Sequence, residues 1–231
     1  MKAALTLLIS GLAEPVVFRV TIFVVAGTVD YWQAWLLLAV FVVSVWTSNT
    51  YLLRAYPAAL QRRMRGGPAA ETRMVQKAVM GGLWLSLMTM LVVSALDHRF
   101  GWTHVPTAIS LVGNVAVAAG LMAPMLVVIQ NNYAAATVRV EAGQSLASTG
   151  LYGLVRHPMY TANVVMMVGI PLALGSYCGL VLVVPGSMVL ALRIRDEEHM
   201  LLAWDCDRGL ALGNGQSGDG NTDNREHDRP G

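Results

Sequence analysis

Charged residues are scarce in this sequence. They make up 13% of its 231 residues, about half of the roughly 25% that is usual in soluble domains. Hydrophobic residues account for 55%, and the mean hydropathy is +0.53. They form long blocks, such as residues 36–45, and do not alternate with polar residues as the strands of a membrane barrel would. The composition therefore predicts a membrane protein built from helices.

Cysteine is almost absent, and the excess of basic over acidic residues is small. Cys178 and Cys206 are the two cysteines, and we expect them on opposite membrane faces, which leaves neither a disulfide nor a zinc site. The net charge is +2 and the pI about 8.7. Most basic residues stand in short loops between apolar blocks, so membrane topology explains them. We therefore expect the lipid bilayer as a partner, with no nucleic acid and no metal.

Six apolar segments divide the chain and predict an all-α bundle of about six transmembrane helices. They cover residues 4–25, 32–53, 79–96, 105–129, 158–174 and 179–192. The turn signal Gly175-Ser176-Tyr177 separates the last two, which are short. We therefore expect the bundle to end in a helical hairpin whose two open ends lie on the same side of the membrane.

Basic residues gather in the loops of one membrane side. Those residues are Arg54, Arg62, Arg63, Arg65, Arg73, Lys77, Arg139, Arg156, Arg193 and Arg195. The positive-inside rule then places both termini in the cytoplasm, and we expect a multi-pass protein of a plasma membrane of the bacterial inner-membrane type. We expect one transmembrane domain over residues 1–203. Residues 204–231 are rich in Gly, Asp and Asn, which predicts a disordered polar tail.

The polar stretch before the fifth segment carries the clearest chemistry. Pro158 suits the first turn of a helix, which puts His157 at or next to the N-cap. A helix start attracts carboxylates through its free N–H groups and its dipole. The hairpin would bring Glu197 and Glu198 back beside it, giving a basic and an acidic wall. The same residues also suit interfacial anchors and a solvated helix end, so their spacing alone does not identify a reaction.

Three motifs together resemble the isoprenylcysteine carboxyl methyltransferase family. They are the Arg-His-Pro-Met-Tyr core of Gly150–Tyr160, the stretch Gly169-Ile-Pro-Leu, and Arg193 with Glu197-Glu198-His-Met-Leu201. Related phospholipid N-methyltransferases and bacterial thiol S-methyltransferases share this pattern, and the resemblance covers about residues 138–202. It implies an S-adenosylmethionine-dependent membrane methyltransferase with a lipophilic acceptor, most like isoprenylcysteine carboxyl O-methylation.

The resemblance also implies which residues form the site. The residues that would hold S-adenosylmethionine are Leu151, His157, Pro158, Tyr160, Glu197 and Glu198. Arg193 would be the catalytic candidate, since it would orient an acceptor carboxylate. We assign no general base, because a carboxylate or thiolate acceptor does not need a strong one.

One departure from the family keeps other interpretations open. Trp204-Asp-Cys-Asp-Arg-Gly stands where family members carry a Tyr-x-x-Tyr-like stretch that closes the cofactor pocket. We therefore expect weakened cofactor affinity, and a catalytically degenerate protein of the same fold is an alternative. A phospholipid N- or small-thiol S-methyltransferase is another. We expect Glu14 and Arg19 in the first segment to face the bundle rather than lipid. They would also suit a small transporter, but the six segments show no inverted repeat. The sequence identifies neither the acceptor nor the oligomeric state.

Overall fold

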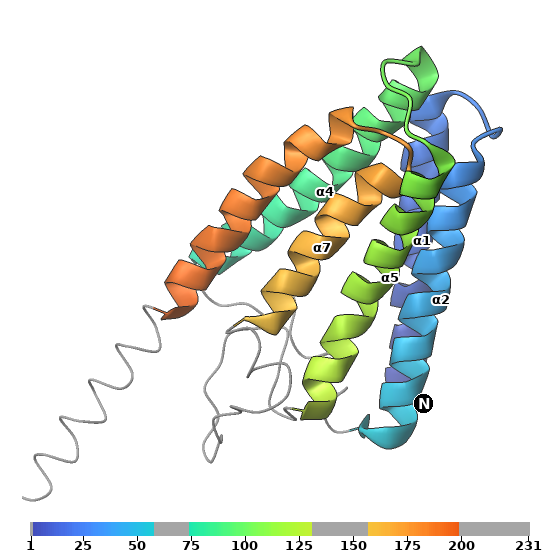
Figure 1. Ribbon diagram of the computed structural model, residues 1–231. Coiled ribbons are helices and arrows are strands. Elements are labelled where there is room, and N and C mark those ends of the chain that lie inside the picture. The colour runs from blue at the N-terminus through green and yellow to red at the C-terminus, as the bar shows by residue number, and fades with distance from the viewer. Residues whose placement is uncertain (1, 58–73, 131–156, 199–231) are drawn as a thin grey trace, which may run out of the picture. The chain divides into compact units, whose positions relative to one another are not determined.

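The computed structural model describes residues 2–57, 74–130 and 157–198, and the regular elements in these ranges are all helices. They are α1 (Lys2–Ala26), α2 (Trp32–Ala55), α4 (Met74–Phe100), α5 (Thr107–Gln130), α7 (Pro158–Ala173) and the 3-10 helix η1 (Cys178–Leu182) (Figure 1). An α-helix over residues 183–198 follows η1 directly. The chain divides into two compact units, Met1–Ala191 and Leu192–Gly231. The packing described below is that of the first unit.

Four of the described helices are long and apolar enough to cross a membrane. They are Trp32–Ala55, Gln76–Phe100, Thr107–Ile129 and Cys178–Glu198, with α7 a shorter apolar helix of 16 residues. This confirms the predicted all-α, polytopic membrane architecture, and the chain is an integral membrane protein. The predicted polar tail, residues 204–231, lies outside the described residues.

Some helix bounds differ from the predicted segments, because a helix can extend beyond its apolar residues or begin where the backbone hydrogen bonds begin. Helix α4 begins at Met74 instead of Val79, because Gln and Lys are good helix formers that extend a helix beyond its apolar stretch. Helix α5 begins at Thr107 because the Pro106 carbonyl accepts the first hydrogen bonds of the helix. The sixth segment begins as a 3-10 helix. The α-helix that follows starts so that Pro185 falls in its first turn, where the missing N–H costs nothing.

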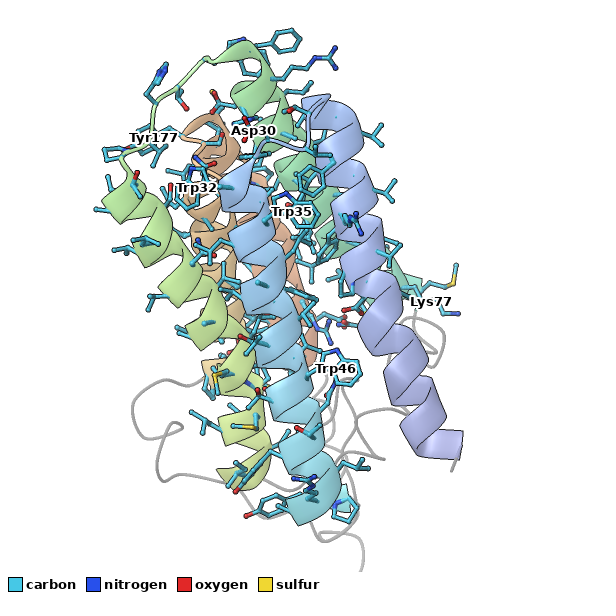
Figure 2. The ribbon with its side chains drawn as sticks, turned by 90° about the vertical axis from the view of Figure 1, so that its right-hand side faces the viewer. Asp30, Trp32, Trp35, Trp46, Lys77 and Tyr177 are labelled. Carbon is cyan, nitrogen blue, oxygen red and sulfur yellow. The ribbon has the colours of Figure 1, made fainter. Side chains whose placement is uncertain are left out.

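Helix termini of the first unit meet at one end, which we call the turn end. Tyr31 at the start of α2 donates its hydroxyl hydrogen bond to the Leu174 carbonyl, 2.5 Å away. Arg99 at the end of α4 donates from Nη1 to the Val25 carbonyl of α1 at 3.3 Å. Asp30, Trp32 and Tyr177 lie at this end in Figure 2. The opposite end, which we call the His157 end, holds the starts of α1, α4 and α7 and the ends of α2 and α5.

A buried carboxylate organises the turn end. Asp97 is 1% exposed and accepts hydrogen bonds from the Thr103 backbone N–H (2.8 Å), the Thr103 hydroxyl (2.6 Å) and the Ser176 hydroxyl (2.5 Å). The two hydroxyls in turn accept the backbone N–H groups of Tyr177 and Gly179, both at 3.1 Å. One side chain of α4 therefore fixes both the loop before α5 and the turn after α7.

Helix α7 ends in the predicted turn. Gly175 adopts φ +73°, a left-handed conformation that glycine tolerates without steric cost. Its N–H donates to the Leu172 carbonyl, and the Ser176 N–H donates to the Pro171 carbonyl at 2.8 Å. These two bonds form a Schellman motif, which satisfies carbonyls that the helix end would leave unpaired. The sequence interpretation of this turn is confirmed.

Helices α5 and α7 approach each other unusually closely through glycine. A Cβ added to Gly113 would lie 2.8 Å from the carbonyl carbon of Leu172, and one added to Gly169 would lie 2.8 Å from the Gly113 carbonyl oxygen. At Gly120 the added atom would lie 2.7 Å from the Met166 Cβ. Gly113 and Gly120 therefore serve helix packing, since any side chain there would push the helices apart.

Candidate cofactor and acceptor site

The start of α7 has the geometry that the sequence predicted. Pro158 is the first helical residue and is buried, and His157 occupies the N-cap with φ −127° and ψ 72°. The His157 carbonyl accepts the first hydrogen bonds of the helix, from the N–H groups of Tyr160 (3.1 Å) and Thr161 (3.0 Å). The His157 side chain makes no capping hydrogen bond. The positive end of the helix dipole therefore faces the His157 end of the bundle.

Two aromatic side chains stand together on this first turn. The rings of His157 and Tyr160 are 5.6 Å apart between centroids and inclined at 43°. Both residues are partly buried. Imidazole and phenol groups beside a helix start combine hydrogen-bonding atoms with flat apolar faces. This first turn therefore places N–H donors, an imidazole and a phenol side by side.

The remaining predicted site residues lie elsewhere in the chain. Leu151, like Arg156, is outside the described residues. Arg193, Glu197 and Glu198 belong to the last turns of the 183–198 helix and to the second compact unit. The structure thus brings together His157, Pro158 and Tyr160. Their meeting with the Glu197-Glu198 pair stays a prediction.

The helical hairpin itself is present in the first unit. An added Cβ at Gly179 would lie 2.6 Å from the Pro171 Cβ, and one at Gly186 would meet the Met167 side chain. Residue numbers therefore rise along one helix as they fall along the other, so α7 and the following helix run antiparallel. This confirms the hairpin that the turn signal predicted.

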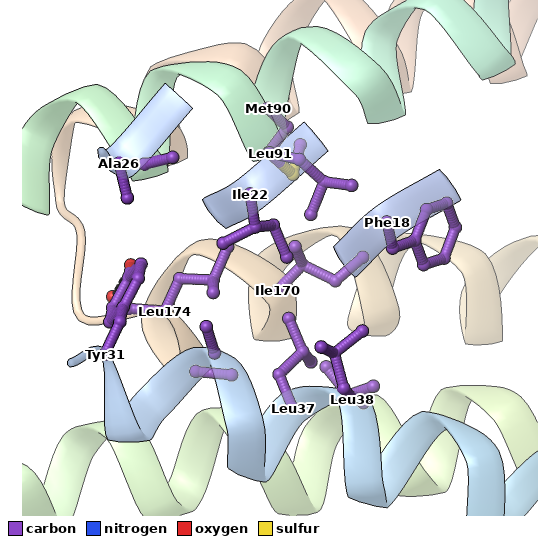
Figure 3. Packing of buried hydrophobic residues seen from close by; sticks show 14 of the residues in the cluster. Phe18, Ile22, Ala26, Tyr31, Leu37, Leu38, Met90, Leu91, Ile170 and Leu174 are labelled. Carbon is purple, nitrogen blue, oxygen red and sulfur yellow. Dashed lines mark hydrogen bonds between the residues drawn. The ribbon is translucent and has the colours of Figure 1, made fainter. Parts of the chain in front are cut away.

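A cavity that sequence reasoning did not find lies inside the first unit. It has a volume of about 210 Å³. Its lining residues are Glu14, Phe18, Ile22, Leu37, Leu38, Phe41, Val45, Trp84, Leu87, Leu91, Val117, Leu121, Met166 and Ile170. Figure 3 shows Ile22, Leu37 and Ile170 pointing toward one another in this region. Glu14 is the one charged residue in an otherwise apolar lining.

The two charged residues of α1 separate in the structure. Glu14 lines the cavity, as the expectation of an inward position required. Arg19, expected to face the bundle as well, is exposed, and its guanidinium carbon lies 5.2 Å from the centre of the Trp35 ring. That part of the expectation was wrong. Residues five apart on an α-helix point about 140° away from each other, and Arg finds its contact on an aromatic face instead.

A comparison with known protein families finds one similarity. Residues 108–204 match the family model described as phospholipid methyltransferase. Over this stretch the chain is similar to that family of membrane methyltransferases. The match starts some thirty residues before the predicted stretch of 138–202 and takes in nearly all of α5. No curated protein and no solved structure was found to match the chain.

The family match gives meaning to the close contact between α5 and α7. Both helices lie within the matched residues, and Gly113, Gly120 and Gly169 join them. The upstream helix α5 is therefore part of the matched segment, which the sequence interpretation had not recognised. Among the described residues no group of three or more His, Cys, Asp or Glu side chains is arranged to hold a metal.

Proposed function

We propose that this membrane methyltransferase transfers a methyl group from S-adenosylmethionine to a lipophilic acceptor at the His157 end of the bundle. The observation that carries the proposal is the start of α7. There the helix start, the His157 ring and the Tyr160 ring stand together within the matched family segment. Leu151, Pro158, Glu197 and Glu198 complete the proposed cofactor site.

Each part of the proposed site has a distinct task. The helix start and His157 would bind the methionine carboxylate, because both present positive or N–H-donating groups. Glu197 and Glu198 would bind the ribose hydroxyls or the amino group as hydrogen-bond acceptors. Arg193 would orient the acceptor. S-adenosylmethionine supplies an activated methyl group on a positively charged sulfur.

The protein contributes alignment and exclusion of water. Methyl transfer is an in-line displacement, so the rate depends on holding the acceptor atom at close range and on the axis of the breaking bond. Rigid helices suit this task better than loops. The acceptor would enter from the bilayer and the cofactor from the cytoplasm, where we propose both termini lie. We propose that the membrane is a plasma membrane of the bacterial inner-membrane type.

Two chemical groups are candidates for the methyl acceptor, a carboxylate and an amine. The sequence motifs resemble enzymes that methylate the carboxylate of a prenylated cysteine. The family model is described by its phospholipid substrates, which favours methylation of a lipid amine. Incubation with labelled S-adenosylmethionine and membrane lipid extracts, followed by mass analysis of the product, separates a methyl ester, a thioether and a methylated amine.

Cofactor binding is the decisive experiment. Isothermal calorimetry of the detergent-purified chain with S-adenosylmethionine should show saturable binding, and His157→Ala should weaken it at least about tenfold, as expected for loss of a hydrogen bond to a charged group. His104→Ala is the matched control, because it removes the same side chain in the loop before α5 at the turn end. Equal binding by wild type and His157→Ala would refute the site. A folded wild-type chain that does not bind would support the catalytically degenerate alternative.

A further inference from the structure

The cavity has a direction that relates it to the proposed site. Along α1 it is lined by Glu14, Phe18 and Ile22, which lie on one face at intervals of four residues. Glu14 is the lining residue of α1 nearest the His157 end, and Ile22 is the one nearest the turn end. The cavity therefore extends about 12 Å along α1, from its acidic end to an entirely apolar end.

The size of the cavity limits what it can hold. Its volume of about 210 Å³ falls below the range of roughly 300–1,000 Å³ that is typical of pockets for whole drug-sized ligands. Its length is less than half of the ~30 Å hydrocarbon core. Its walls beyond Glu14 are aliphatic or aromatic, which suits hydrocarbon. One slender apolar chain, or the end of one, matches both the volume and the walls.

The Glu14 carboxylate determines which polar group such a ligand can carry. At the edge of an apolar cavity a carboxylate is poorly hydrated, so it attracts an ammonium group and repels a second carboxylate. Arg19 does not offset this, because its guanidinium lies over the Trp35 ring. The polar end of the ligand would thus be cationic and would lie toward the start of α7.

We propose that this cavity binds the apolar chain of an amine-headed amphiphile, and that Glu14 is the residue that selects the amine. The inference rests on the proposed function in one respect, namely that this amphiphile is the methyl acceptor. Met166 is the cavity-lining residue of α7 nearest the His157 end, and it stands about 12 Å along α7 from Pro158; an amine at the acidic end of the cavity would lie toward Pro158. It would therefore lie between the cavity and the proposed cofactor site.

A photolabelling experiment without cofactor tests the inference by itself. A dodecylamine probe that carries a diazirine near the end of its chain is activated on the purified chain in neutral nanodiscs, and labelled peptides are mapped by mass spectrometry. We expect saturable labelling of cavity residues such as Leu91 and Ile170 near the apolar end. At mildly alkaline pH, unlabelled dodecylamine should compete at least about tenfold better than dodecanoic acid of the same chain length.

Three variants make the test specific. Glu14→Gln keeps the size of the side chain and should abolish the preference for amine over acid. Asp30→Asn removes one negative charge from the exposed loop at the turn end and should leave that preference intact. Leu121→Phe should fill the cavity and reduce labelling of the cavity residues by the dodecylamine probe. Circular dichroism reports whether this variant folds. If Leu121→Phe does not fold, Glu14→Gln still decides the selectivity.

The outcomes separate this inference from the proposed function. Labelling confined to lipid-facing residues, or equal competition by amine and acid, would overturn the inference even if the chain binds S-adenosylmethionine. Amine-selective labelling that depends on Glu14 would support the inference even if cofactor binding fails. In that case the cavity would be an amphiphile site in a protein that has lost its cofactor.

Discussion

The glycine contact between α5 and α7 leads to the sharpest stability prediction. Gly113→Ala would place a Cβ 2.8 Å from the carbonyl carbon and the Cβ of Leu172. Carbon atoms in ordinary contact are about 3.5 Å apart, so the helices would have to separate by at least roughly 0.7 Å, since the Ala173 backbone nitrogen would lie closer still. Overpacking of this kind costs about 1–3 kcal/mol, whereas alanine gains about 1 kcal/mol of helix propensity over glycine. We expect a net loss of about 1–2 kcal/mol, because the obstructing atoms belong to backbone.

The matched control for this substitution is Gly81→Ala. Gly81 lies in α4, and a Cβ there would meet no atom within 4 Å. The same change of residue should therefore raise the free energy of unfolding by up to about 1 kcal/mol. Both variants are compared by far-UV circular dichroism during unfolding in mixed micelles of mild and denaturing detergent. If Gly113→Ala and Gly81→Ala shifted the transition equally, the close approach of α5 and α7 would be wrong.

Two further predictions concern the turn end. Asp97→Asn replaces an acceptor oxygen by a donor that faces hydroxyls and an N–H, and it should lower the free energy of unfolding by about 1.5–3 kcal/mol. The unfolding transition of the control Asp30→Asn should not move. Equal shifts for the two variants would contradict the Asp97 network. Tyr31→Phe removes the bond to the Leu174 carbonyl but keeps the stacking on His98, whose ring centroid is 3.6 Å away, so we expect a smaller loss of about 1 kcal/mol. A loss for Tyr31→Phe as large as that for Asp97→Asn would contradict this ranking, because it would give one hydroxyl hydrogen bond the same weight as the whole Asp97 network.

The turn end should also lose stability at alkaline pH. Burial and the nearby Asp97 carboxylate raise the pKa of the Tyr31 phenol above its ordinary value. A raised pKa of an acid means that the folded state binds the proton more tightly than the unfolded state. The stabilisation is therefore fully present below the ordinary tyrosine pKa and is lost as pH rises toward the folded pKa. At neutral pH the phenol is neutral and donates its hydrogen bond.

Features that depend on neighbouring residues could be predicted from the sequence. The start of α7 follows from Pro158, which is favourable at a first helical position and unfavourable in the interior. The turn at Gly175 follows from the residue type alone. Both signals act within a few residues, so no tertiary information is needed to read them. For the same reason the helix bounds were less accurate where a helix continued into polar residues, as at Met74.

Features that depend on distant residues could not be predicted. Asp97 reads as an isolated charge at a helix end, and its partner Ser176 is 79 positions away along the chain. The cavity arises because side chains from α1, α2, α4, α5 and α7 leave a space between them, and no single segment carries a mark of that space. Arg19 shows the same limit, because its position depends on the ring of Trp35 in the next helix.

These long-range contacts explain how the start of α7 is held in place. The turn after α7 is tied to α4 through Asp97, and the helix is fixed laterally by glycine contacts with α5. His157 lies one helix length from that turn, about 24 Å for 16 residues, so a small rotation at the turn end would move it by several ångströms unless the lateral contacts resisted. The two kinds of contact therefore have separate roles. Loss of the Asp97 hydrogen bonds weakens the fold while the glycine contacts still hold α7, whereas separation of α5 and α7 moves the helix that carries His157. Among variants of similar stability, those at Gly113 or Gly169 should therefore disturb the proposed cofactor site more than those at Asp97.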